Sequence, residues 1–469
     1  MVDDSLSALE AGFLHLESAV TPMHVGSVGV YDGAGWHDRA GRLRLRALRA
    51  YIAGRLPDLP RLRQVPRWPA ARSGRPIWVD DPDFDIARHV RARHLTPPGD
   101  EARLLDAVAA IHMQLLDRDH PLWSFTFLEG LPGGRVALVE RLHHALVDGI
   151  GGVDLTMLLL DTAPLASSAR RSPRVPAHPV QAAAPSAADG VAGTGLASLV
   201  REPLAVGRGL AAAAAHPVQA ATATRQLASA VASVATRPLA PPSSLNTPIG
   251  PTRRYLVVRR SLPDARRTAH ALHGTVNDVV LAAVTAGFQA LLASRGEPPP
   301  PELHALVPVS VRTPDEHRAL GNRVATLIVP LPLRVTDPGA RFTATHRAAQ
   351  HAKDHHQAQL ATAILEFAEH WPEPAVAACS WLVQRQRIVN VVVTNVPGPP
   401  VPLYLMGARM LEVAPIVPLS RNLTVSVGVL SYLDQLAVGL WADADRVPDL
   451  PVLAAGIEDG FDALDALTG

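Results

Sequence analysis

The chain has 469 residues, of which 48% are hydrophobic and 19% charged, and its formal net charge is +1. This composition is typical of a globular protein and excludes a disordered chain, and the near-neutral charge gives no reason to expect nucleic acid as a partner. A chain of this length predicts two domains of about 150–250 residues each. The single cysteine, Cys379, excludes an intrachain disulfide framework, and its apolar surroundings predict a buried structural thiol.

The N-terminus is acidic, whereas a secretory signal would be basic, and no uninterrupted apolar run reaches the about 18–20 residues of a membrane span. We therefore expect a cytoplasmic protein, with contact to a membrane surface left open.

The first 160 residues alternate helix and strand patterns. Ser5 is predicted to cap a helix that buries Leu6, Leu9, Phe13 and Leu16. The elements expected after it are a strand over 23–33, a helix over 102–117, strands over 121–131 and 134–144, and a short helix over 149–161.

Residues 161–245 are rich in alanine, proline and serine and predict an interdomain connection with helical stretches near 196–215 and 218–235. The second half, 246–469, resumes the alternation. Thr275 is expected to cap a helix that has Gly296 just past its end, and the last helix buries an apolar face from Leu450 to Leu464. The strands expected in this half cover 252–262, 303–312, 322–333, 390–400, 422–433 and 435–443. This pattern predicts the α/β class, with domains over 1–160 and 246–469.

The stretch VERLHHALVDGIGGVDL, Val139 to Leu155, combines two histidines with an aspartate and glycines at fixed spacing. His143 and His144 end an apolar strand and precede a glycine-rich turn, a junction where functional side chains concentrate. A second pair, His355–His356, has no such sequence after it and is expected on a solvated surface.

Three chemistries were compared for the first pair. A metal site needs three or four ligands, and no HExxH motif or Cys/His cluster accompanies the pair, so we expect no metal. A serine nucleophile in a GxSxG turn is absent. General-base catalysis remains, because a neutral imidazole accepts a proton near pH 7 and glycine N–H groups can stabilise an oxyanion.

HHALVDG resembles the HHxxxDG motif of the CoA-dependent acyltransferase and condensation-domain superfamily. Other blocks, in order along nearly the whole chain, resemble the bacterial wax ester synthase/diacylglycerol acyltransferase family. They are LSALEAGFLHLES, TPMHVG, DHPLW, LNTPIGPTRRY, TVNDVVLAAV, LVPVSVR, LGNRVATLIVPLP and TNVPGPP. The region around Arg421 and the alanine-rich connection depart from the family pattern.

The resemblance implies two chloramphenicol-acetyltransferase-like domains with a tunnel at their interface. It implies an O-acyltransferase that makes triacylglycerol from acyl-CoA and diacylglycerol, or wax esters from acyl-CoA and a long-chain alcohol. Acyl-CoA would be a co-substrate and no cofactor is expected. A peripheral location at the inner face of the membrane or at lipid droplets would follow from these substrates.

The resemblance also suggests roles for single residues. His144 is the expected general base, His143 a supporting residue, and Asp148 a structural residue beside Gly149. The substrate-binding candidates are Pro121, Leu122, Trp123, Asn277 and Asp278.

Several of these residues could instead have a purely structural role. Trp123 could equally be a core aromatic residue, and Asn277 and Asp278 could simply cap a helix and complement its dipole. Arg253 and Arg254 could meet an anionic CoA group or be solvated.

Three alternative functions stay open at this stage. His143 to Asp148 also fits the HxxxxD pattern of glycerol-phosphate acyltransferases, which would make His143 the base. A peptide-forming condensation domain shares HHxxxDG, but it normally sits beside carrier and adenylation domains, and from this sequence we expect neither. The third alternative is a non-catalytic lipid-droplet protein on the same scaffold.

Overall fold

The computed structural model describes residues 5–69, 74–147, 158–164, 239–310, 324–354, 371 and 373–468. Asp148, Gly149, the pair His355–His356 and nearly all of the predicted connection over 161–245 lie outside these residues.

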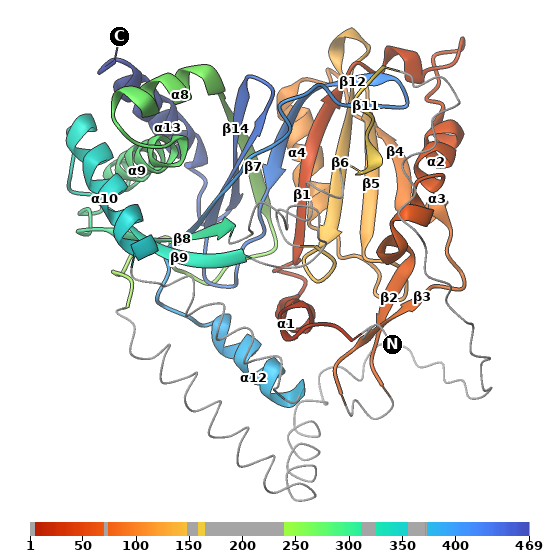
Figure 1. Ribbon diagram of the computed structural model, residues 1–469, viewed down its shortest axis with the longest axis horizontal. Helices are drawn as coiled ribbons and strands as arrows, with labels where there is room; N and C mark the ends of the chain where they lie inside the picture. The colour runs from red at the N-terminus through yellow and green to blue at the C-terminus, as the bar shows by residue number, and fades with distance from the viewer. Residues whose placement is uncertain are drawn as a thin grey trace, which may run out of the picture. The chain divides into compact units, whose positions relative to one another are not determined.

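The first of two large sheets is built mainly from the N-terminal half. Its strand order is β11-β12-β1-β6-β5-β4 (Figure 1). The strands are β1 (His24–Tyr31), β4 (Val90–His94), β5 (Trp123–Glu129), β6 (Val136–His143), β11 (Tyr404–Leu405) and β12 (Ala408–Ile416). Every residue of β6 is buried, which explains why this strand is largely apolar apart from the charged Glu140 and Arg141.

The second sheet comes entirely from the C-terminal half, with strand order β7-β14-β13-β10-β8-β9. The strands are β7 (Arg253–Ser261), β8 (Leu303–Ser310), β9 (Val324–Leu331), β10 (Val391–Val396), β13 (Val425–Tyr432) and β14 (Gln435–Asp443). All six strands expected in this half are therefore confirmed, with ends shifted by a few residues.

Strand β12 was not predicted, and it crosses between the two halves. It pairs antiparallel with β1, so that Gly26 faces Ile416. At its end, the Tyr255 hydroxyl of β7 donates to the Pro415 carbonyl at 2.9 Å. A Cβ on Gly439 would lie 2.1 Å from the same oxygen, so β14 approaches β12 at a distance that only glycine permits. Strand pairing in the first sheet therefore extends across the predicted boundary between the domains.

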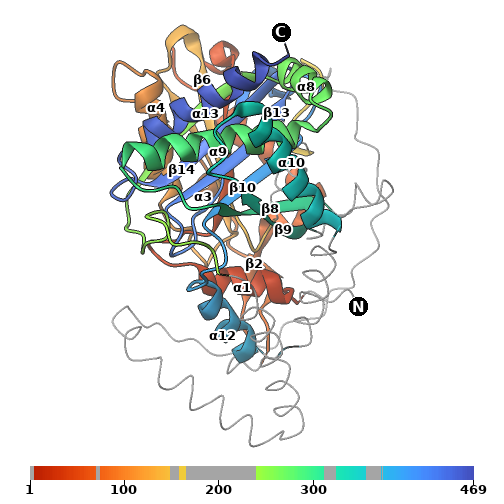
Figure 2. The ribbon, with the colours of Figure 1, turned by 90° about the vertical axis from the view of Figure 1, so that its left-hand side faces the viewer.

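Four helices cover one face of the second sheet (Figures 1 and 2). They are α8 (Leu262–Ala271), α9 (Val276–Ser294), α10 (Pro338–Asp354) and α13 (Leu450–Asp465). The predicted Thr275 cap is confirmed. Within the described residues α9 is the one helix long and apolar enough to cross a membrane, but 67% of its apolar window is buried, as in a core helix.

The remaining elements lie outside the two large sheets and the four helices above. They are α1 (Ala8–Leu16), α2 (Leu45–Ala53), α3 (Ile86–His89), α4 (Glu101–His112), α12 (Glu373–Val383), the hairpin β2 (Gln64–Arg67) with β3 (Ile77–Asp80), and the 3-10 turns Gly33–Trp36, Leu56–Asp58, Pro60–Arg63 and Pro132–Gly134. The prediction that Ser5 caps α1 is wrong. Ser7 is the cap, because its hydroxyl accepts from the Glu10 N–H while the Glu10 carboxylate accepts from the Ser7 N–H.

Candidate active site

The paired histidines lie where β6 ends, and two of the family-like sequence blocks hold their backbone. The His143 N–H donates to the Leu122 carbonyl at 2.9 Å, and the His144 N–H donates to the Met23 carbonyl at 2.7 Å. The PLW and TPMHVG blocks thus fix the backbone that carries both imidazoles.

His143 is fully buried, and each of its ring nitrogens faces a polar group. The Ala145 N–H donates to His143 Nδ1 at 3.0 Å, so Nδ1 carries no proton in this arrangement. The proton is then on Nε2, which faces Glu17 Oε1 at 3.3 Å. His143 has neither a free lone pair nor an exposed surface with which to deprotonate a substrate.

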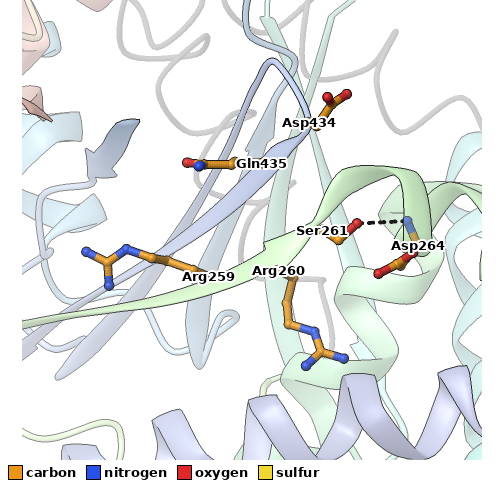
Figure 3. Close-up of a pocket in the computed structure, with 6 residues that line it drawn as sticks. All are labelled: Arg259, Arg260, Ser261, Asp264, Asp434 and Gln435. Atoms are coloured by element: carbon orange, nitrogen blue, oxygen red, sulfur yellow. Dashed lines mark hydrogen bonds between the residues drawn. The ribbon is translucent and has the colours of Figure 1, made fainter. Parts of the chain in front are cut away.

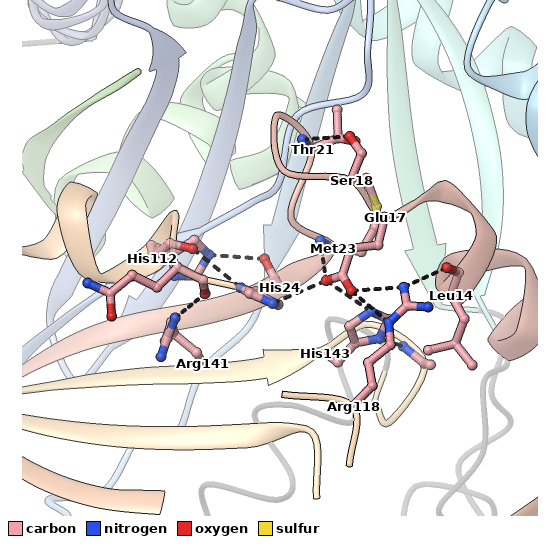
Figure 4. Close-up of polar contacts among 12 residues, drawn as sticks. Leu14, Glu17, Ser18, Thr21, Met23, His24, His112, Arg118, Arg141 and His143 are labelled. Atoms are coloured by element: carbon pink, nitrogen blue, oxygen red, sulfur yellow. Dashed lines mark hydrogen bonds and ion pairs between the residues drawn. The ribbon is translucent and has the colours of Figure 1, made fainter. Parts of the chain in front are cut away.

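Glu17 is the centre of the polar network around this histidine (Figure 4). Its side chain is only 3% exposed, and Oε1 lies 3.3 Å from Nε2 of both His143 and His24. Arg118 donates to Oε2 through Nε at 3.1 Å and Nη2 at 2.9 Å. Burial alone would raise the pKa of Glu17, but the two imidazoles outweigh it and hold the pKa well below its ordinary value.

The network continues on the other side of His24, which faces His143 across the β1–β6 pairing. His24 Nδ1 lies 3.3 Å from the His112 carbonyl, and His112 Nε2 donates to the His24 carbonyl at 3.0 Å. Burial lowers the pKa of both His24 and His112. Arg141 donates to the Ile111 carbonyl at 2.7 Å and so closes the end of α4.

His144 differs from its neighbour because it is only partly buried. Its ring stacks on Phe13 of α1, with centroids 3.9 Å apart and planes 11° apart. Nδ1 is buried and, among the described residues, has no hydrogen-bond partner. Burial lowers the pKa of His144 to about 4, although the backbone of His144 and Val147 acts in the opposite direction. The imidazole is therefore neutral at pH 7, the form that a general base requires.

The PLW residues support this junction from the core. Trp123 is 1% exposed, donates from Nε1 to the Leu62 carbonyl at 2.8 Å, and stacks on His89 at 4.6 Å. Leu122 is fully buried, and the Pro121 carbonyl accepts from the Trp123 N–H. These contacts are those of a core aromatic residue and its neighbours, and they do not bring Trp123 to the His144 imidazole.

Asn277 and Asp278 occupy the first turn of α9. The Asp278 carboxylate completes a capping box by accepting from the Thr275 N–H at 2.8 Å, and it pairs with His346 Nδ1 at 2.9 Å. Asn277 Oδ1 accepts from Asn395 Nδ2 at 3.3 Å, which joins the TVNDVV and TNVPGPP blocks. The buried Asp278 carboxylate thus serves the cap of α9 and the contact with His346, while Asn277 is only partly buried.

Arg253 has neither of the two expected surroundings. Its side chain is 1% exposed and donates to the carbonyls of Gly250 and Val20, so it ties the start of β7 to the chain before β1. Arg254 donates to the Pro448 carbonyl at 3.0 Å. The thiol of Cys379 is partly buried, and this burial raises its pKa.

An open pocket of about 420 Å³ lies elsewhere, at the end of β7 (Figure 3). Its lining consists of Arg259, Arg260, Ser261, Asp264, Asp434 and Gln435. Arg259 already pairs with Glu412, and Arg260 with Asp465. The pocket contains no predicted site residue. Within the described ranges, no group of three or more His, Cys, Asp or Glu residues is arranged to hold a metal ion.

Sequence reasoning missed Glu17, His24 and Arg118. Glu17 and His24 lie inside quoted blocks, LHLES and TPMHVG, and Arg118 directly precedes DHPLW. Their position within or next to the family-like blocks was the only signal in the sequence. The sequence does not show that a carboxylate in one block faces an imidazole in another.

Comparison with solved structures first defines the class. The fold matches that of the starter condensation domain of rhizomide synthetase RzmA, in complex with C8-CoA and Leu-SNAC, with a TM-score of 0.56 and 16% identity over 99% of this chain and 94% of that one. A wax ester synthase/diacylglycerol acyltransferase from Marinobacter aquaeolei VT8 matches with a TM-score of 0.71 and 25% identity, over 99% of this chain and 100% of that one. The fold is that of the HHxxxDG acyltransferase and condensation-domain superfamily, which confirms the predicted α/β class.

The family follows from the sequence. Residues 6–280 match the wax ester synthase/diacylglycerol acyltransferase catalytic domain, and residues 320–465 match the WS/DGAT C-terminal domain. A Mycobacterium tuberculosis protein named "Probable diacyglycerol O-acyltransferase tgs1" is 34% identical over 99% of this chain and 96% of its own length. The chain belongs to the wax ester synthase/diacylglycerol acyltransferase family, and the predicted class of enzyme, an acyl-CoA-dependent O-acyltransferase, is confirmed.

Proposed function

We propose that the protein transfers a fatty acyl group from acyl-CoA to the hydroxyl of diacylglycerol or of a long-chain alcohol, with His144 as general base. The observation that carries this assignment is the contrast within the histidine pair. His143 is enclosed, with Nδ1 accepting from the Ala145 N–H and Nε2 facing Glu17, whereas His144 is partly exposed and neutral. This contrast also argues against the HxxxxD alternative, which requires His143 to act.

In the proposed reaction, His144 Nε2 removes the hydroxyl proton as the acceptor oxygen attacks the thioester carbonyl. We assign Nε2 because Nδ1 is buried. The tetrahedral oxyanion then collapses, the carbon–sulfur bond breaks, and the departing CoA thiolate takes the proton back from the imidazolium. No acyl-enzyme is required, because the thioester is already activated.

The other groups act by position. Phe13 fixes the plane of the His144 ring, and Met23 fixes its backbone. Glu17 holds His143 and, through it, the strand end that carries His144. We retain Asp148 and Gly149 as residues that shape the following turn. Pro121, Leu122 and Trp123 support the site from the core, and Asp278 does so through the cap of α9, whereas Asn277 remains a candidate for substrate contact.

The proposal includes the setting of the reaction. Both acceptors partition into bilayers or lipid droplets, so the enzyme would work at the cytoplasmic side of a lipid surface as a peripheral protein. The domains would be 1–160 and 246–469, joined by 161–245, with the reaction in a tunnel between them.

The test is a radiolabelled acyl-CoA assay with three arms: diacylglycerol, hexadecanol, or no acceptor. Products are separated by thin-layer chromatography, and the His144→Ala protein is the control for each arm. Labelled triacylglycerol or wax ester from the native protein alone would support the proposal. Release of CoA without an ester product, or no product in any arm, would contradict it. Competition between the two acceptors in one tube then ranks them.

A further inference from the structure

The C-terminal end of α12 presents three consecutive exposed apolar side chains. Trp381, Leu382 and Val383 are 53%, 41% and 47% exposed. Exposed hydrophobic residues that are scattered singly need no explanation, but an adjacent Trp, Leu and Val on one helix end mark a surface that meets something apolar.

A fourth apolar residue lies beside this helix end. Leu239 is 68% exposed, and the N–H of the next residue, Ala240, donates to the Arg387 carbonyl at 2.8 Å. Two chain segments that are distant in the sequence therefore meet just after this helix, and each exposes apolar side chains.

The charged side chains at the end of α12 and in the residues that follow it are all positive. Arg385 and Arg387 are exposed, and residues 374–390 contain no aspartate or glutamate. The Arg385 guanidinium lies 3.7 Å from the centre of the Trp381 ring. Exposed Arg421, noted as a departure from the family pattern, adjoins Asn422, whose side chain donates to the Gln386 carbonyl.

We propose that this surface, the α12 patch (Leu239, Trp381, Leu382, Val383, Arg385 and Arg387), binds a lipid surface that carries anionic headgroups. An amphipathic ring beside aliphatic side chains suits the boundary between headgroups and acyl chains, and neighbouring arginines suit the negative headgroups. We favour a lipid over other partners because an exposed Trp lies next to exposed arginines and no aspartate or glutamate is present in residues 374–390.

The patch lies one helix away from the proposed base. Helix α12 packs on α1, where His15 Nε2 lies 2.6 Å from Glu373 Oε1 and the Gln384 side chain donates to the Leu16 carbonyl at 2.9 Å. Phe13 of the same α1 stacks on His144. We infer, on the basis of the proposed function, that the α12 patch brings the enzyme to the lipid surface that holds its acceptor.

The experiment measures binding of the full chain to two kinds of vesicle, phosphatidylcholine alone and phosphatidylcholine with phosphatidylglycerol. Trp381→Ser with Leu382→Ser is expected to lower the partition coefficient at least about tenfold on both. Arg385→Gln with Arg387→Gln is expected to lower it only on anionic vesicles, by roughly fivefold for each cation removed. Leu467→Ser with Arg266→Gln is the matched control and should bind as the native protein does, because these exposed residues lie in the turn after α13 and on α8.

Activity separates this inference from the proposed function. The patch variants should acylate a water-soluble short-chain alcohol as fast as the native protein, while their rate on vesicle-embedded diacylglycerol falls by the same factor as binding. A native protein inactive on both acceptors would refute the proposed function. This inference would be refuted if the protein is active and the patch substitutions leave its vesicle binding unchanged. It would also be refuted if light scattering shows that the substitutions only dissociate a dimer.

Discussion

His24 and His143 face one another across strands β1 and β6, and both direct Nε2 at the same oxygen of Glu17, at 3.3 Å. One buried carboxylate thus joins the TPMHVG block to the HHxxxDG block. Since Arg118 donates to the other oxygen, the negative charge is fully compensated inside the protein. This arrangement encloses His143 and therefore supports the proposed assignment of the general base to His144.

The first prediction concerns this division of roles. His144→Ala should lower kcat at least about 100-fold while the circular dichroism spectrum stays unchanged and Tm changes little, because His144 Nδ1 makes no hydrogen bond to the described residues and the ring contributes only its stack on Phe13. His143→Ala should lower the free energy of unfolding by about 1–3 kcal/mol, because buried Glu17 loses a donor. Full activity in the His144 variant, with a well-folded but inactive His143 variant, would reverse the assignment.

Glu17→Gln tests the network itself. The amide keeps the size of the side chain but brings an N–H donor to a site already surrounded by donors, so we expect about 3 kcal/mol of lost stability and a fall in kcat of roughly tenfold or more. Glu10→Gln, in the helix that Glu17 directly follows, is the matched control. It retains a capping-box residue, so denaturant unfolding should change by less than about 1 kcal/mol and kcat should not change. Equal effects of the two substitutions would show that Glu17 has no special role.

The activity should depend on pH through the neutral form of His144. Burial lowers the pKa of His144 to about 4, so the base form is populated throughout pH 6–8 and is lost only as the pH falls through that value. We expect kcat/KM, followed by thiol release, to be flat with respect to this group at neutral pH and to decline in acid. An acid limb centred near pH 6.5 would mean that the imidazole is solvated in the free enzyme.

Stability should fall over a related range. Between the ordinary pKa of histidine and the lowered pKa of His144, the unfolded chain binds more protons than the folded one, so unfolding becomes easier as the pH falls from about 6.5 toward 4. The pKa of Glu17 is also lowered, so the protein loses further stability as the pH falls below the ordinary pKa of a glutamate. Urea unfolding at a series of pH values measures both, and a midpoint that stays constant from pH 7 to 4 would contradict the burial argument.

The first turn of α9 gives a prediction that separates capping from substrate contact. Asp278→Ala removes the acceptor of the Thr275 N–H and the partner of His346, so we expect about 1–2 kcal/mol of lost stability with an unaltered KM for acyl-CoA. Asn277→Ala should cost less stability, since it loses one 3.3 Å contact with Asn395. A raised KM in the Asp278 variant at full stability would instead place its carboxylate at the substrate.

The sequence predicted the elements that depend on local patterns. Helix α9 begins at its Thr275 cap and ends before Gly296, whose φ of 66° favours glycine, and α13 buries Leu450, Leu453, Ile457, Phe461 and Leu464 as its periodicity required. Periodicity and capping act over a few residues, so they are legible in the letters. The ordered motifs were sufficient to predict the family for the same reason: each block is a local string.

What the sequence could not determine was which distant strings meet. Strand β12 pairs with β1 in the first sheet, although the linear order assigned it to the second half. The contacts of Trp123 with Leu62 and His89 show that it is a core residue, which the sequence alone left open. The residue types also offered no reason to distinguish the two histidines, whereas in the structure it is the His143 ring that faces the Ala145 N–H and Glu17. Burial and pKa depend on the groups that packing brings within a few ångströms, whatever their separation along the chain. The letters therefore supplied the chemistry available at residues 143 and 144, and the tertiary contacts distinguished the two imidazoles.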